Sequence, residues 1–247
     1  MDSASFVLLS QEQALRRRLD VVANNMANAS TVGFKREQPQ FHEFVEQMPE
    51  ADVPDARNTS YVLDYGTVHD VTQGSFQATG NPLDVMIEGS GYLSVEGENG
   101  QNFYTRAGAL KISEAGQLVT AAGQRVLGEG GQPIQVPLDQ AAALVIAADG
   151  SVSGPTGQLG RLTVTRFADE GSVKPVGNNL YSGQGGEVVP ALEVRLRSGG
   201  LEASNVQPIA ETATMLDVLR AYQTSMKLSE SLNDLRQRAI DRLGRAG

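Results

Sequence analysis

One helical pattern lies in FVLLSQEQALRRRLDVVANNMAN, residues 6–28, where apolar side chains recur three, four or seven positions apart. A second pattern of this kind lies near the other end of the chain in MLDVLRAYQTSM, residues 215–226. An amphipathic helix buries its apolar stripe against a neighbour, so two such stripes predict helices that pack on each other. The sequence therefore predicts a discontinuous, coiled-coil-like helical domain with a long insertion between its halves.

We expect the first helix to run from Ser3 or Ser5 to about Asn28. A serine can cap the first turn, short amide side chains compete for backbone hydrogen bonds, and glycine accepts the left-handed conformation of a helix end. The ending is formed by Asn24, Asn25, Asn28 and Gly33.

The last helix is expected to begin between Gln207 and Ala210 and to run to about Leu243. Pro208 suits its first turn, where a missing amide hydrogen costs no helical hydrogen bond. After residue 226 the apolar positions restart two residues out of step. Such a shift moves the buried stripe around the helix, so we expect this helix to contact more than one neighbour.

The middle of the chain shows short β segments separated by glycine-rich turns. One predicted hairpin joins residues 92–95 to 103–106 through Glu98-Asn99-Gly100, and another joins 144–148 to 151–153. Residues 36–80 lack sustained periodicity and contain Pro39, Pro49 and Pro54, which predicts an extended connector with at most one short strand or helical turn.

The predicted fold class is α+β. We expect the helical domain to cover residues 1–35 and 201–247, the connector 36–80 and 186–200, and an irregular antiparallel β domain 81–185.

The composition excludes several classes of function. The 247-residue chain has 40% apolar residues, a net charge of -9 and no cysteine. Disulfides, zinc-thiolate sites and thiol nucleophiles are therefore absent, and a nucleic-acid partner is disfavoured because it requires a positive face. The apolar stretch Phe6–Leu9 is too short for a signal peptide or a membrane span, so we expect neither.

The search for catalytic chemistry gives no candidate. The two histidines, His42 and His69, have no carboxylates at metal-ligand spacing, and they are interpreted as surface or packing residues. The glycines of residues 128–131 lack the spacing of a dinucleotide-binding loop and are interpreted as turns. We expect no enzyme, no cofactor, no metal and no small-molecule substrate.

Four sequence blocks resemble the bacterial flagellar rod and hook proteins. They are LDVVANNMANASTVGFK at residues 19–35, QGSF with TGNPLD at 73–84, YTRAG at 104–108, and LEASNV at 201–206. The middle domain is too short for a hook protein, so the resemblance is to the basal-body rod proteins and favours a proximal-rod position.

This resemblance implies a structural subunit of a tubular, helical drive shaft that transmits torque across the periplasm. Its partners would be copies of itself, other rod proteins, the flagellar type III export apparatus, which would carry the chain out of the cell, and the surrounding basal-body rings. Heterologous interfaces that do not close into a ring produce such helical assemblies.

Two groups of residues are predicted to matter for assembly. We expect subunit contacts at Leu15, Leu19, Val22, Met26, Leu216, Leu219, Tyr222 and Met226. An ordinary intramolecular coiled-coil core is the alternative for each of them. We expect residues that fix register or form turns at Asn24, Asn25, Asn28, Gly33, Phe34, Ser204 and Asn205.

Three other interpretations stay open at this point. The distal-rod paralogue shares every block quoted above. A secreted β-rich binding module on a helical stalk would need an exposed aromatic or charged groove, whereas aromatic residues make up only 5% of the chain. A hydrolase would need a nucleophile, a base and an orienting group that converge.

Overall fold

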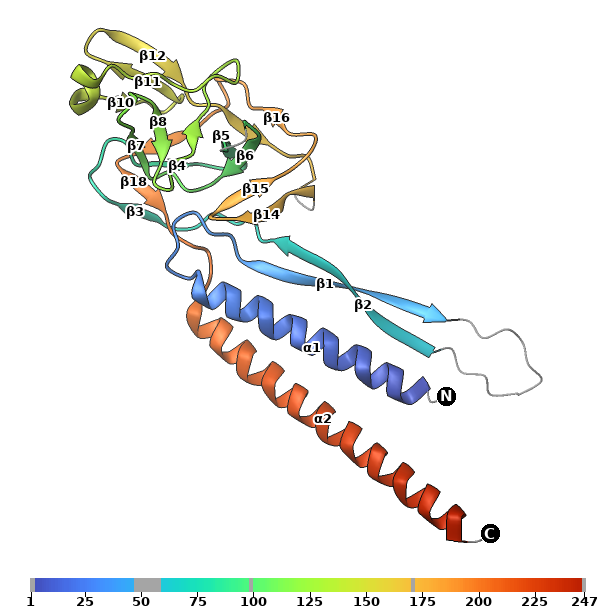
Figure 1. Ribbon diagram of the computed structural model, residues 1–247. Helices are drawn as coiled ribbons and strands as arrows, with labels where there is room; N and C mark the ends of the chain where they lie inside the picture. The colour runs from blue at the N-terminus through green and yellow to red at the C-terminus, as the bar shows by residue number, and fades with distance from the viewer. Residues whose placement is uncertain (1–2, 47–58, 98–99, 170–171, 246–247) are drawn as a thin grey trace. The chain divides into compact units, whose positions relative to one another are not determined.

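A computed structural model describes residues 3–46, 59–97, 100–169 and 172–245 (Figure 1). The chain divides into two compact units, each built from distant parts of the sequence. The helical unit comprises Met1–Ala27, Glu37–Val68 and Gln207–Gly247, and the β unit comprises Asn28–Arg36 and His69–Val206. The residues predicted as connector are thus shared between the two units.

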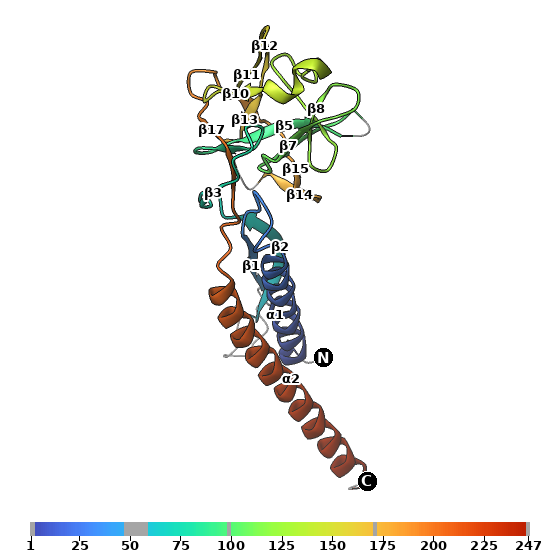
Figure 2. The same cartoon turned by 90° about the vertical axis from the view of Figure 1, so that its left-hand side faces the viewer.

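The helical unit contains the two predicted helices, α1 (Ser3–Ala27) and α2 (Pro208–Arg245). Both lie within about two residues of their expected bounds. The helices pack along each other, and Figures 1 and 2 show them side by side. Arg236 near the end of α2 donates a hydrogen bond to the Ser5 hydroxyl near the start of α1, so the helices run antiparallel.

Buried positions recur every seven residues along both helices, which is the spacing of a coiled-coil seam. These positions are Leu8, Leu15 and Val22 on α1, and Glu211, Val218 and Ser225 on α2. The seam of α2 therefore includes two polar side chains, and its buried stripe differs from the one that hydrophobicity alone predicts.

The rest of the helical unit is a two-stranded ribbon of β1 (Glu37–Glu46) and β2 (Thr59–His69). The expectation of at most one short strand here was wrong. Pro39 lies within β1, and a two-stranded ribbon tolerates proline because each strand has one edge without ladder hydrogen bonds. Pro49 and Pro54 lie outside the described residues. The ribbon packs on α1 through β1.

The β unit is built from short strands joined by tight turns. Its central sheet has the order β14-β15-β6-β5-β9-β8-β7, and β13 joins it by pairing with both β5 and β16. The strands of this sheet are β5 (Tyr92–Glu96), β6 (Asn102–Thr105), β7 (Leu110–Ile112), β8 (Leu118–Thr120), β9 (Arg125–Val126), β13 (Val164–Arg166), β14 (Lys174–Gly177), β15 (Leu180–Ser182) and β16 (Glu187–Val188).

Smaller sheets complete the β unit. One has the order β10-β11-β12, and the others pair β17 with β4 and β18 with β3. Their strands are β3 (Phe76–Ala78), β4 (Val85–Ile87), β10 (Val145–Ile146), β11 (Ser151–Gly154), β12 (Gly157–Arg161), β17 (Leu196–Ser198) and β18 (Gly200–Glu202), and a short 3-10 helix, η1, spans Leu138–Ala143.

Both predicted hairpins are confirmed as antiparallel pairs. Ser94 of β5 lies opposite Tyr104 of β6, and Val145 of β10 lies opposite Ser153 of β11. Residues 98–99 of the first predicted turn lie outside the described residues. The expectation of an irregular antiparallel β domain also holds, because the pairings between the described strands of this unit are antiparallel and two of them, β11–β12 and β14–β15, carry register shifts.

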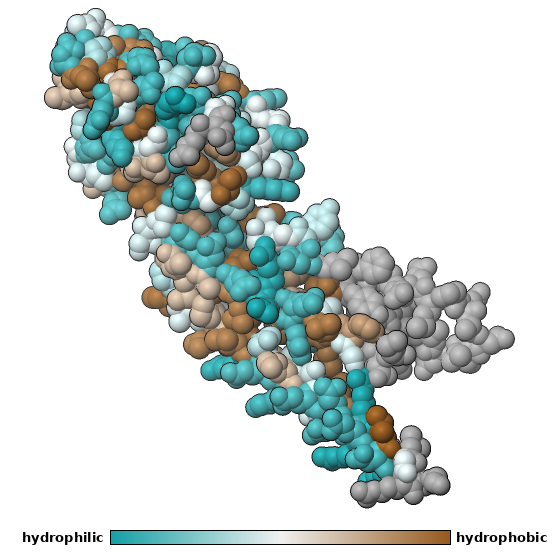
Figure 3. Space-filling model, viewed as in Figure 1, coloured by the Kyte–Doolittle hydropathy of each residue, from teal (hydrophilic) through white to brown (hydrophobic). Residues whose placement is uncertain are grey.

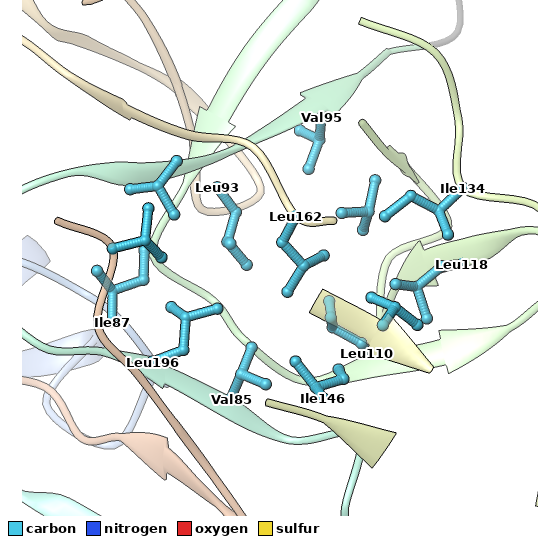
Figure 4. Packing of buried hydrophobic residues seen from close by; sticks show 14 of the residues in the cluster. Val85, Ile87, Leu93, Val95, Leu110, Leu118, Ile134, Ile146, Leu162 and Leu196 are labelled. Atoms are coloured by element: carbon cyan, nitrogen blue, oxygen red, sulfur yellow. The ribbon is translucent and has the colours of Figure 1, made fainter. Parts of the chain in front are cut away.

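The β unit has a continuous aliphatic core between these sheets. Leu93, Val95, Leu118, Leu162 and Leu196 are among the buried side chains that converge there (Figure 4). Burial of such side chains from water is the main favourable contribution to folding of the unit.

We expect Leu162→Ala to destabilise the β unit by about 2–5 kcal/mol, because it leaves a cavity in a packed core. The urea midpoint of the full chain, followed by far-UV circular dichroism, measures this. Leu192→Ala is the matched control, since Leu192 is 99% exposed. Similar losses in both variants would contradict the assignment of this core.

Candidate functional site

The four sequence blocks meet inside the β unit at the carboxylate of Glu202, which is only 1% exposed. Its Oε1 accepts hydrogen bonds from Lys35 Nζ at 2.6 Å and from the Gly74 amide at 2.9 Å. Its Oε2 accepts one from the Arg106 guanidinium at 3.3 Å. We call Lys35, Gly74, Arg106 and Glu202 the junction.

The two cations of the junction are also fixed by backbone carbonyl oxygens. Lys35 Nζ donates to the Thr72 carbonyl at 2.8 Å, and Arg106 donates to the Gly89 carbonyl at 2.8 Å. Burial lowers the pKa of the Lys35 ammonium below its ordinary value, and the charge of Arg106 lowers it further, although Glu202 opposes both effects. Two buried cations therefore share one carboxylate.

Two glycines allow the backbone segments to approach each other at the junction. The Gly33 amide donates to the Glu202 carbonyl at 2.8 Å, and Gly33 has a φ of 68°. An added Cβ would lie 2.5 Å from the Arg106 backbone. A Cβ on Gly74 would lie 1.8 Å from the carbonyl oxygen of Ala203. A side chain at either position would separate segments that the buried ion pairs require to be close.

The side chain of Asn205 forms hydrogen bonds with the backbone of three other residues. Its Oδ1 accepts the Arg36 amide at 2.7 Å, and its Nδ2 donates to the carbonyls of Asp70 at 2.8 Å and Thr72 at 3.0 Å. The neighbouring Ser204 hydroxyl accepts the amide of Val206 at 3.2 Å. Both polar residues predicted in this block thus bind backbone groups.

The predicted asparagines at the end of α1 contact backbone as well. Asn25 is fully buried, and its side-chain amide both donates to the Glu37 carbonyl at 2.9 Å and accepts the Glu37 amide at 2.8 Å. Asn24 hydrogen-bonds the Glu37 carboxyl. Asn28 lies in the turn after the helix, where it accepts the Thr31 hydroxyl at 3.2 Å. Within the helical unit, Asn24 and Asn25 therefore bind α1 to the start of β1.

The eight predicted subunit contacts fall into three groups in the structure. Leu15 and Val22 are buried within the chain, and Leu216 and Met226 are exposed. The half-buried residues are Leu19, Met26, Leu219 and Tyr222. Phe34, predicted with the signature residues, is buried in the β unit.

Sequence reasoning assigned no role to Lys35, Arg106 or Glu202. All three lie in the quoted blocks. The presence of a charged residue in each of three blocks was the one feature of the sequence that could have indicated the ion pairs. Their charges could not be paired in advance, because Lys35 and Glu202 lie 167 positions apart.

Neither histidine of the chain belongs to the junction. His42 packs on Tyr65 at a ring distance of 4.4 Å, and His69 is buried edge-on to Tyr181 at 5.1 Å. Among the described residues, no group of three or more histidines, cysteines or carboxylates is placed to hold a metal ion. A search of the same residues for a helix long and apolar enough to cross a membrane found none.

Three protein-family models match the chain, and each contains one charge of the junction. The flagella basal body rod protein model matches residues 10–35 and includes Lys35. The model of the flagellar hook protein FlgE/F/G D1 domain matches 86–154 and includes Arg106. The model of the flagellar basal body rod FlgEFG protein C-terminal matches 197–242 and includes Glu202.

Full-length relatives agree with these matches. The chain is 36% identical to the flagellar basal-body rod protein FlgF of Caulobacter vibrioides, over 99% of both chains. It is 32% identical to FlgG of Agrobacterium fabrum, over 90% of this chain and 92% of the relative. It is 30% identical to FlgF of Salmonella typhimurium, over 97% of both chains.

The chain therefore belongs to the flagellar basal-body rod protein family. Within this family it is FlgF-like, and it is a structural subunit of the rod rather than an enzyme. The family expected from the four blocks is confirmed.

We expect Glu202→Gln to destabilise the protein by about 3–5 kcal/mol, because it leaves Lys35 and Arg106 buried without a counter-charge. Urea unfolding followed by circular dichroism measures the loss. The matched control is Glu96→Gln, whose 3.0 Å ion pair with Arg125 is partly exposed and should contribute less than about 1 kcal/mol. Equal losses would show that the junction is not a special stabilising feature.

We expect the titration of Glu37 to make the stability of the helical unit depend on pH. Burial raises the pKa of this carboxyl above its ordinary 4.5, although the Asn24 hydrogen bond and Arg17 oppose the shift. Between 4.5 and the raised pKa the native protein binds more protons than the unfolded chain. The contribution of Glu37 to stability is therefore complete below 4.5 and is lost as pH rises through the raised pKa.

Glu37→Gln should accordingly gain stability relative to the wild type as the pH is raised from 4.5 to 7. Urea midpoints of both proteins at the two pH values test this, with the exposed Glu187→Gln as control. A gap between variant and wild type that is the same at both pH values would mean that Glu37 titrates normally.

Proposed function

We propose that this chain builds the proximal part of the flagellar rod as one of many subunits in a helical tube that transmits torque across the periplasm. Its proposed neighbours are copies of itself and other rod proteins, with the export apparatus as its route and the surrounding rings as further contacts. The proposal rests on the unpartnered apolar surface of α2.

The helical unit leaves large apolar side chains of α2 in water. Ile209 is 88% exposed, Leu216 51%, Leu235 59% and Ile240 68%. In Figure 3 brown apolar patches lie among the teal polar residues of this part of the chain. Apolar side chains gathered on one helix favour association, because contact with a neighbour removes them from water.

The lengths of the helices support the same conclusion. At 1.5 Å per residue, the 38 residues of α2 span about 57 Å and the 25 residues of α1 about 38 Å. Ser5 contacts Arg236, so residues 237–245 of α2 continue past the start of α1, as both views show (Figures 1 and 2). The overhanging end of α2 can contact a neighbouring subunit only through a surface that differs from itself. Such a contact between two different surfaces is heterologous.

Heterologous contacts that do not close into a ring repeat along an axis and generate a helical assembly. Leu216 and Met226 remain proposed subunit contacts, because they are exposed in the single chain. Leu15 and Val22 are occupied by packing within the chain and are proposed to hold the α1–α2 pair as one rigid element. Close-packed helices resist deformation, as a shaft under torque requires.

The proximal position is proposed from relatives. The FlgF proteins of Caulobacter vibrioides and Salmonella typhimurium align with almost the whole chain, as does the FlgG protein of Agrobacterium fabrum, with slightly lower coverage. The identity to FlgF of Caulobacter vibrioides favours the FlgF position in the rod over that of the paralogue.

Single cysteines test the proposed contacts, because the natural chain has none. We expect Leu235→Cys to cross-link to a neighbouring subunit when purified basal bodies are labelled with maleimide-benzophenone and irradiated, because this reagent needs only one cysteine, and denaturing gels to show the larger species. Val218→Cys on the same helix is the matched control, since Val218 is buried in the seam. Complete rods in which Leu216→Cys, Leu235→Cys and Ile240→Cys all stay uncross-linked would refute the proposed surface.

A further inference from the structure

The β unit contains a hollow of about 320 Å³ that lies outside the junction. It lies beside β5, β6 and β13, and hydroxyl, amide and aliphatic side chains surround it. Its polar and aromatic lining residues are Ser94, Asn102, Tyr104, Glu129, Thr163 and Thr165, its aliphatic ones are Leu127 and Val188, and Gly130, Gly131 and Gly186 complete the wall. A volume near 300 Å³ is at the lower end of the range for small-molecule sites.

The hydroxyls of this lining are only partly used by the fold. Ser94 Oγ and Thr165 Oγ1 bond to each other at 2.8 Å, which leaves each with further hydrogen-bonding capacity. The Thr163 hydroxyl is buried and has no hydrogen-bonding partner among the described residues. A buried hydroxyl without a hydrogen-bonding partner costs free energy. A ligand that formed a hydrogen bond with Thr163 would remove this cost.

The charge of the lining disfavours an anion. It contains no lysine, arginine or histidine, and its one carboxylate, Glu129, accepts a hydrogen bond from Arg161 at 2.8 Å. An anionic ligand would have no cation in the lining to compensate it and would meet a carboxylate. A purely apolar ligand is also disfavoured, because it would leave the hydroxyls and the amide unsatisfied.

The walls leave room for a ring-shaped ligand. Gly130 and Gly131 have φ values of 83° and 73° and contribute no side chain. A side chain does not fit at Gly186, since its Cβ would lie 2.6 Å from the Thr165 side chain. The ring of Tyr104 is held edge-on against Phe167 at 4.8 Å, which fixes an aromatic surface at the hollow.

We propose that this hollow binds a neutral saccharide. Such a ligand presents hydroxyls that can pair with Ser94, Thr163, Thr165 and Asn102, an apolar ring face for Tyr104, and no charge. The proposal does not rest on the apolar surface of α2, because every lining residue belongs to the β unit.

Saturation-transfer NMR on the full chain tests this binding with two neutral trisaccharides, tri-N-acetylchitotriose and cellotriose, and with glucose 6-phosphate as the anionic probe. We expect transfer to at least one neutral sugar and none to the phosphate. Thr163→Val should weaken sugar binding about five-fold in a titration, since it removes one hydrogen bond. It should leave the melting temperature unchanged or higher, because the hydroxyl makes no bond in the free protein.

Ser113→Ala is the matched control, because Ser113 lines a different hollow of the same unit. It should bind the sugar as the wild type does. No transfer to either neutral sugar would overturn the proposal. Equal affinity in Thr163→Val and wild type, or stronger transfer to glucose 6-phosphate than to both neutral sugars, would also overturn it.

Discussion

The buried carboxylate of Glu202 is the interaction on which the β unit depends. It binds an ammonium 167 positions away and a guanidinium 96 positions away, with one backbone amide as a third donor. Each partner belongs to a different block of the sequence, so the blocks work as one unit. Removal of the carboxylate would leave both cations buried without a counter-charge, which is more costly than replacing the whole cluster by apolar side chains.

The helical unit follows a different principle, because its own packing is incomplete. Its seam has polar groups at Glu211 and Ser225, while large apolar side chains of the same helix face water. Polar positions in a coiled-coil seam fix register at a cost in stability. A helix pair of this kind is defined enough to form within one chain and retains apolar area for neighbouring subunits.

The features predictable from the sequence were the local ones. Helical periodicity placed α1 and α2, and turn residues placed the β5–β6 hairpin, because these signals depend on neighbouring residues. The ribbon was missed since Pro39 and irregular alternation mask its strands, and its pairing joins residues on either side of a long segment. The buried stripe of α2 does not follow from hydrophobicity, because Glu211 and Ser225 lie in it while Met226 is exposed. The junction depends on contacts between distant residues, which no periodicity reveals.

The hydrogen bond from Gly33 to Glu202 has a consequence for the order of folding. Pairing α1 with α2 in an unstructured chain would close a loop of about 180 residues. Once residues 33 and 202 are joined, only five residues on each side, 28–32 and 203–207, separate the helices from the fixed point. The shorter closure saves about 2.5 kcal/mol of chain entropy. The folded β unit therefore lowers the entropic cost of pairing the two helices, which favours pairing after the β unit has formed.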